Sequence, residues 1–212
     1  MTDDKRGPAA QTRPGGAAWI FLAVVALAFA IGVWIAPNER SLGAGIKTVY
    51  VHVALTWTGM LGFAVSGLIG LVLAISAQPS LHAWMKSVGW VALPFYATGA
   101  VMSIVAAQVN WGGVLWSEPR MTATMLGLAG AIVLVVVNNW LPWRRVQGLF
   151  SFGFAVLLVA SIRNATLFFH PANPIGASFS TGIQSAFIGL FVLSCIAAMW
   201  SVWYVRRRVH GR

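Results

Sequence analysis

Residues 111–122 read Trp-Gly-Gly-Val-Leu-Trp-Ser-Glu-Pro-Arg-Met-Thr and lie between two long apolar runs. The segment holds one of only 4 acidic and one of 14 basic residues in the chain of 212. Because Pro119 favours the first turn of a helix, the sequence predicts a helix that begins near Ser117 or Glu118. Arg120 then lies where a cation opposes the helix dipole. We therefore expect Arg120 to pair with Glu118 or with an anionic ligand.

Trp111 and Trp116 stand on either side of Gly112 and the glycine that follows it. A segment with two indoles around a flexible centre is expected at the surface of the protein. Aromatic residues commonly anchor membrane proteins at the boundary between lipid and water. An interfacial anchor and a surface that holds a flat ligand are both open interpretations of this segment.

The composition predicts an integral membrane protein. Hydrophobic residues make up 58% of the chain and charged residues 8%, against roughly one quarter charged in an ordinary soluble domain. The net charge of +10 could suggest nucleic acid, but the basic residues lie at the ends of apolar runs, as topology signals do. We therefore expect contact with the lipid bilayer and no nucleic-acid partner.

The chain has a single cysteine, Cys195, and no CxxC or CxxCH sequence. This excludes a disulfide framework, dithiol exchange and covalent c-type haem attachment to this chain.

Six apolar runs are each long enough for the about 20 residues that a spanning helix needs. The fold prediction is therefore an all-α, polytopic membrane protein with six transmembrane helices. We expect residues 1–16 to form a disordered tail, residues 17–205 a single membrane bundle, and residues 206–212 a basic tail. The predicted spans are 17–36, 48–76, 89–108, 119–141, 146–168 and 180–205.

The distribution of lysine and arginine predicts the orientation of the bundle. Of the 14 basic side chains, all but Arg40, Lys47, Arg120 and Arg163 fall on the side that holds the two chain ends. By the positive-inside rule both termini are expected to be cytoplasmic, in a cell (inner) membrane. Residues 111–118 then lie on the outer side. We expect the first apolar run to be retained, because it continues for six residues past its Ala-Phe-Ala sequence.

The second apolar run carries small residues at every fourth position. In lipid such a stripe allows a neighbouring helix to approach closely, so we interpret it as a packing seam. Its members are Ala54, Thr58, Gly62, Ser66, Gly70 and Ala74.

Two of the four histidines are candidates for function. His82, in an expected cytoplasmic loop, and His210, in the tail, are interpreted as solvated. His52 and His170 instead lie near the outer ends of their runs, in the same leaflet as residues 111–118. An ionisable residue at that depth is a functional candidate. A histidine that is merely hydrogen-bonded at the interface is the alternative for each.

Two imidazoles without a cysteine or carboxylate cluster suit axial ligation of a haem iron better than a structural zinc site. The indoles of Trp111 and Trp116 could cover the porphyrin ring, and Arg120 with Arg163 could neutralise its carboxylates. For Arg163, a side chain that snorkels at a helix end is the favoured alternative. Thr56 and Gly59 share a helix face with His52 and serve either as its supporting residues or as packing.

The sequence also resembles a known family at these residues. The segment 49–57, Val-Tyr-Val-His-Val-Ala-Leu-Thr-Trp, is similar to the tyrosine, histidine and tryptophan segment of the CcmC-type haem-handling proteins of cytochrome c maturation. The segment that starts at Trp111-Gly112 resembles their tryptophan-rich outer motif. Glu118 stands at its aspartate position, Arg120 and Thr122 match, and Trp116 falls one place from the pattern. Residues 114, 115 and 117 depart from the aromatic residues usual there.

The resemblance implies haem b, held non-covalently by His52 and His170, with the ring against Trp111, Gly112, Trp116, Glu118 and Arg120. It implies a carrier that presents haem for cytochrome c maturation and works with ABC-type permease and ATPase subunits and a membrane-tethered haem chaperone. No nucleophile with a base partner occurs in the outer loops, so we do not expect an enzyme. A bis-histidine electron carrier, a haem-attachment synthase and a haem-free permease or scaffold subunit remain alternatives.

Overall fold

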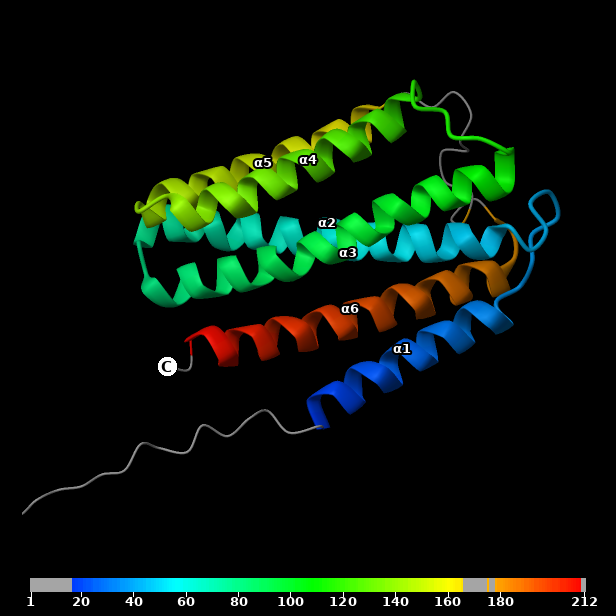
Figure 1. Ribbon diagram of the computed structural model, residues 1–212, viewed down its shortest axis with the longest axis horizontal. Coiled ribbons are helices and arrows are strands. Elements are labelled where there is room, and N and C mark those ends of the chain that lie inside the picture. Colours follow the sequence, from blue (N-terminus) through cyan, green and yellow to red (C-terminus); the bar gives the residue numbers. More distant parts are fainter. Residues whose placement is uncertain (1–16, 166–174, 176–177, 211–212) are drawn as a thin grey trace, which may run out of the picture.

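The computed structural model describes residues 17–165, 175 and 178–210, and the regular elements in these residues are helices. Five of them are long and apolar enough to cross a membrane. The first helix has 19 residues, or about 28 Å, just under the about 30 Å of a hydrocarbon core. The helices shown in Figure 1 are α1 (Ala17–Ile35), α2 (Ile46–Ser76), α3 (Pro79–Trp111), α4 (Pro119–Trp140), α5 (Arg144–Asn164) and α6 (Thr181–His210).

The start of α3 differs from the sequence-based expectation by ten residues. Ala77 adopts a left-handed conformation (φ 55°) and closes α2 through a bond from its N–H to the carbonyl of Leu73. Pro79 then begins α3, because its missing N–H is harmless in a first turn. His82 therefore lies in the helix and not in a loop, and its Nε2 is 2.5 Å from Oε1 of Gln147 on α5. The expectation that His82 is solvated is wrong.

A tightly packed hairpin of α2 and α3 forms the centre of the molecule. A Cβ atom added to Gly59 would lie 2.5 Å from the backbone nitrogen of Tyr96. One added to Gly62 would lie 2.7 Å from Cβ of Ala92. Glycine at these positions thus lets the two backbones approach closely, which is how helices associate in lipid.

The predicted packing seam of α2 is confirmed, and it contacts several neighbours. The Thr58 hydroxyl lies 3.8 Å from the sulfur of Cys195 on α6. The Ser66 hydroxyl donates to the carbonyl of Met85 on α3. A Cβ atom on Gly70 would lie 2.6 Å from a backbone carbonyl oxygen of α5. Small residues at every fourth position therefore allow three helices to pack against α2.

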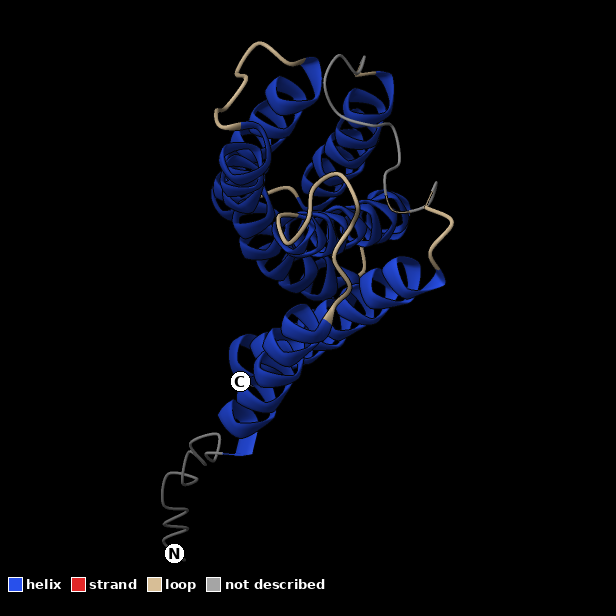
Figure 2. Cartoon of the chain, turned by 90° about the vertical axis from the view of Figure 1, so that its right-hand side faces the viewer, coloured by secondary structure: helices blue, strands red, loops and turns tan. Residues whose placement is uncertain are grey.

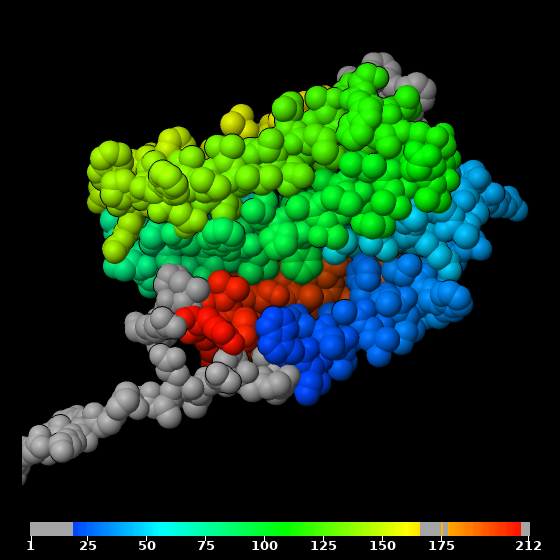
Figure 3. All heavy atoms as spheres, viewed as in Figure 1, coloured from blue at the N-terminus to red at the C-terminus, as the bar shows by residue number. Residues whose placement is uncertain are grey.

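The remaining helices form layers on either side of this hairpin. Figures 1 and 2 agree that α4 and α5 lie on one side of α2 and α3, and that α6 and α1 lie on the other. On the molecular surface, α1 and the end of α6 form one edge while α4 runs along the opposite edge (Figure 3). At the end of α6, Arg206 stacks on Trp84 of α3 at 3.9 Å and Arg207 on Trp203 at 4.0 Å.

The segment 112–118, here called the Trp loop, joins α3 to α4 at one end of the bundle (Figure 1). The start of α2 and the ends of α1 and α5 lie at this same end, here called the Trp-loop end. The described chain begins and ends at the opposite end. This arrangement agrees with the expected grouping of the two termini away from the Trp loop.

Replacing Gly59 with alanine should destabilise the protein by about 1–3 kcal/mol, because the added methyl group meets the backbone of α3 and not a movable side chain. The measurement is the free energy of unfolding in detergent. Gly153→Ala on α5 is the matched control, since nothing lies within 4 Å of its added Cβ. Equal effects of the two variants would contradict the assigned packing.

The membrane orientation is tested by labelling cysteines in intact cells, with Cys195→Ser as the background. We expect Gly113→Cys in the Trp loop to react with a membrane-impermeant maleimide, because the positive-inside rule places that loop outside. Arg212→Cys should react only after the cells are opened. The reverse pattern would show that the bundle has the opposite orientation.

Candidate functional site

His52 lies in the second turn of α2, about 9 Å along the helix from its start at the Trp-loop end. Its ring is half-buried against α3. The Nδ1 atom is 2.8 Å from the carbonyl oxygen of Gly99 on α3 and 3.3 Å from the hydroxyl of Thr56. Because a carbonyl oxygen only accepts, Nδ1 is the donor in the bond to Gly99.

This hydrogen bond determines the tautomer of the ring. A neutral imidazole with its proton on Nδ1 carries its lone pair on Nε2. Histidines that ligate metals characteristically donate their other ring N–H to a carbonyl or carboxylate in this way. His52 therefore has the tautomer and the supporting contact of a ligand that binds through Nε2. The same bond also fits a purely structural histidine between two helices.

Gly99 and Thr56 form the supporting contact for His52. A Cβ atom on Gly99 would lie 2.4 Å from the Thr56 hydroxyl and 2.6 Å from the Thr56 backbone nitrogen. Glycine at this position thus allows α2 and α3 to come close enough for the ring of His52 to reach the Gly99 carbonyl. The sequence analysis named Thr56 but missed Gly99. A glycine inside an apolar helix indicates a close approach by a neighbouring helix, but it does not identify that helix.

Asn110 connects the end of α3 to the start of α2. Its amide nitrogen donates to the carbonyl of Gly45 and lies 3.2 Å from the hydroxyl of Thr48. Because Trp111 follows directly, this contact fixes the point at which the chain leaves α3. The sequence analysis also missed Asn110. A polar amide in the last turn of an apolar helix could have indicated a hydrogen bond to a neighbouring element.

The Trp loop exposes the two expected indoles. Trp111 is 39% and Trp116 60% exposed. Gly112 ends α3 with φ 73°, a conformation that favours glycine, and its N–H bonds to the carbonyl of Gln108. The hydroxyl of Thr122 on α4 donates to the carbonyl of Trp116 and holds that part of the loop.

The predicted helix start after the Trp loop is confirmed. Glu118 takes the N-cap position of α4, and Pro119 is its first residue. The Glu118 side chain is only 2% exposed, and a negative charge is stabilised at a helix N-terminus by the backbone dipoles. Arg120 follows in the first turn and is half-buried. Glu118 and Arg120 therefore both lie where the Trp loop meets α4.

The structure brings His52, Trp111, Gly112, Trp116, Glu118 and Arg120 to the same end of the bundle. Arg163, in the last turn of α5, is exposed at this end as well. His170 lies outside the described residues. The convergence of His52 and His170 on a single ligand therefore stays a prediction.

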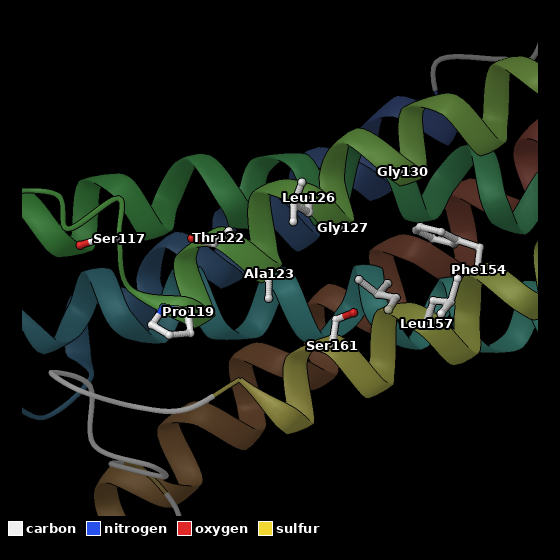
Figure 4. Close-up of a pocket in the computed structure, with 11 residues that line it drawn as sticks. Ser117, Pro119, Thr122, Ala123, Leu126, Gly127, Gly130, Phe154, Leu157 and Ser161 are labelled. Atoms are coloured by element: carbon white, nitrogen blue, oxygen red, sulfur yellow. The ribbon is translucent and has the colours of Figure 1, made fainter.

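A groove between α4 and α5 was not anticipated from the sequence. It has a volume of about 590 Å³, within the about 300–1,000 Å³ of ordinary ligand sites. It extends from Ser117 in the Trp loop to Gly130 and Phe154 deeper in the bundle, and Figure 4 shows its lining side chains. The groove thus begins at the candidate site.

No protein-family model matches the chain. The chain is 27% identical to the iron(3+)-hydroxamate import system permease protein FhuB of Escherichia coli (strain K12). This alignment has 158 residues and covers 69% of this chain and 21% of FhuB. Over 103 residues, 49% of its length, the chain is 20% identical to a putative cytochrome c biosynthesis ccmC-like mitochondrial protein of Marchantia polymorpha, covering 45% of it. The chain thus spans about a fifth of the length of the first of these curated relatives and just under half of the length of the second.

These similarities support a distant family link. The name of the first relative describes a permease of an import system, and that of the second a protein of cytochrome c biosynthesis. Together with the apolar helices, they support a multi-pass membrane protein that fits a membrane component of a transport or maturation complex.

The structural part of the His52 contact is tested by comparing His52→Ala with His52→Asn. The alanine variant loses the bond to Gly99 and should be less stable by about 0.6 kcal/mol, the average for interhelical hydrogen bonds in membranes. The asparagine amide can donate from nearly the position of Nδ1, so this variant should keep most of that stability. The measurement is unfolding in detergent. Equal stability of all three proteins would show that the bond contributes nothing.

Proposed function

We propose that this chain holds haem b non-covalently at the outer face of the cytoplasmic membrane and delivers it for cytochrome c maturation. In this role it is a carrier and not an enzyme. It works within a complex that contains ABC-type permease and ATPase subunits, and a membrane-tethered haem chaperone receives the haem. The similarity to the ccmC-like protein supports this proposal.

The observation that carries the proposal is the orientation of His52. Its Nδ1 donates to the Gly99 carbonyl, so Nε2 is the ring nitrogen through which His52 would ligate a metal. Among the described residues, no three His, Cys, Asp or Glu side chains gather into a metal site. A haem iron needs only one or two axial ligands from the protein, because the porphyrin supplies the other four. The donor chemistry of this chain therefore fits haem, with His170 as the second proposed ligand.

The other residues of the site have distinct proposed roles. The exposed indoles of Trp111 and Trp116 cover the porphyrin faces and exclude water. Arg120 binds a haem carboxylate by a charge-assisted hydrogen bond. Gly112 provides the sharp turn between the two indoles, and buried Glu118 fixes the start of the helix that carries Arg120. A site formed by a surface loop is open enough to release its cargo to a partner.

A haem-free permease or scaffold subunit is the second candidate, and the longer alignment with FhuB favours it. In such a protein the close packing of α2 against α3 and α5 would serve only to assemble a bundle. His52 would then be a structural link between α2 and α3. The two candidates differ in whether Nε2 of His52 binds iron.

The test is a haem titration of the purified protein in lipid nanodiscs, followed by absorption spectra in the oxidised and reduced states. His52→Asn should weaken haem binding by about tenfold or more, because it keeps a donor toward Gly99 but removes the ligating nitrogen. His82→Ala is the matched control. It also removes an imidazole from a helix contact, but at the end opposite the Trp loop.

Haem loss in His52→Asn but not in His82→Ala supports the proposal. A wild-type protein that binds no haem, or a His52→Asn variant with the wild-type spectrum and affinity, would overturn it in favour of the permease or scaffold role.

A further inference from the structure

Close contacts hold α4 and α5 at a fixed distance along the groove between them. Tyr96 of α3 lies behind Gly127 of the groove lining, and its hydroxyl donates to the carbonyl of Thr124 on α4. A Cβ atom on Gly127 would lie 2.6 Å from the Leu158 side chain and 2.7 Å from the Tyr96 hydroxyl. At the deep end, one on Gly130 would lie 3.0 Å from the ring of Phe154. These contacts fix the distance between the two helices below the groove.

The lining of the groove changes from polar to apolar with depth. Of the hydroxyl-bearing residues in the lining, Ser117 and Thr122 lie toward the Trp-loop end, and Ser161 lies further along, near the level of Leu126 (Figure 4). Leu126 and Phe154 line the deeper part. An occupant that matches this lining is mostly apolar and carries hydrogen-bonding groups at one end.

The groove is continuous with the candidate haem site. Ser117 belongs to both the Trp loop and the groove lining, and Pro119 lines the groove directly before Arg120. A ligand whose polar end lies among the hydroxyls is therefore next to the first turn of α4. Backbone N–H groups at that helix start and the Arg120 guanidinium both favour a carboxylate there.

We propose that this groove is the lateral entry through which haem passes from the bilayer to the Trp loop. The proposal rests on the proposed function and adds the route by which its cargo arrives. The apolar porphyrin ring lies between α4 and α5, and its two carboxylates face Ser117, Thr122 and Ser161. Movement toward the Trp-loop end then brings the ring to the exposed indoles.

A phospholipid is the competing occupant, because it also has one polar end. Two features favour the porphyrin. The groove leads into a loop with two exposed indoles, which suit a flat aromatic ring better than a flexible chain. Arg120, the residue after Pro119 of the lining, would supply a cation for the carboxylates of a porphyrin. A membrane-facing groove that served only to hold a lipid tail would need neither feature.

The experiment uses metal-free protoporphyrin IX, which has the ring and carboxylates of haem but no iron to ligate. Binding to the full chain in lipid nanodiscs is followed by the quenching of tryptophan emission. Ala123→Trp places an indole in the groove and should weaken protoporphyrin binding by about tenfold or more. Ala129→Trp adds the same side chain at an exposed position of α4 that does not line the groove. This control should retain the wild-type affinity.

A second blocking variant, Ser161→Trp, approaches the groove from α5 and replaces Ala123→Trp if that variant does not fold. Equal affinities in the blocking and control variants would overturn the entry route. So would a wild-type protein that binds no more protoporphyrin than empty nanodiscs, which would indicate an acyl chain as the occupant. Failure of the proposed function has a different signature, because His52→Asn would then leave haem affinity unchanged whatever the groove variants do.

Discussion

The close contact between α2 and α3 is the constraint on which the rest of the structure depends. Gly59 and Gly99 remove two side chains from this contact, so that the two backbones meet directly. In lipid, where water gives helices no apolar driving force to associate, such packing is a main source of stability. The same approach brings the Gly99 carbonyl within hydrogen-bonding distance of His52. The packing of the bundle and the chemistry of the candidate site thus share one contact.

Polar side chains inside the bundle are used to connect helices. The Tyr96 hydroxyl bonds to α4, the Ser66 hydroxyl to α3, and the Asn138 amide to the Ser151 hydroxyl on α5. Each of these bonds satisfies a group that would be costly to leave in hydrocarbon. His52 differs chemically from them, because its ring has a second nitrogen that can ligate iron. His52 thus joins two helices as a serine or asparagine could, and it also carries a nitrogen with metal-binding chemistry at the Trp-loop end.

The sequence predicted the helices well because a spanning segment has a composition and a length that are set by the bilayer. It also predicted the start of α4, since Pro119 acts locally. It failed at the start of α3, where the polar residues His82 and Lys86 were expected in a loop but lie in the helix, and where His82 contacts Gln147 of α5. Gly99 and the groove were missed for a related reason. Both are defined by which helices become neighbours, and that information is not local.

The position of α3 explains why the Trp loop matters to both the site and the groove. Among the described residues the backbones of α2 and α4 do not come close to one another, because α3 and α5 lie between them. The Tyr96 side chain of α3 contacts α4 behind the groove, while Gly99, one turn nearer the Trp loop, faces α2 and His52. The body of α3 thus lies between a ligand in the groove and His52, and the end of that helix lies nearest to both. That end is Trp111 and the Trp loop, so the indoles lie beside a path that leads from the groove around α3 to the candidate ligand.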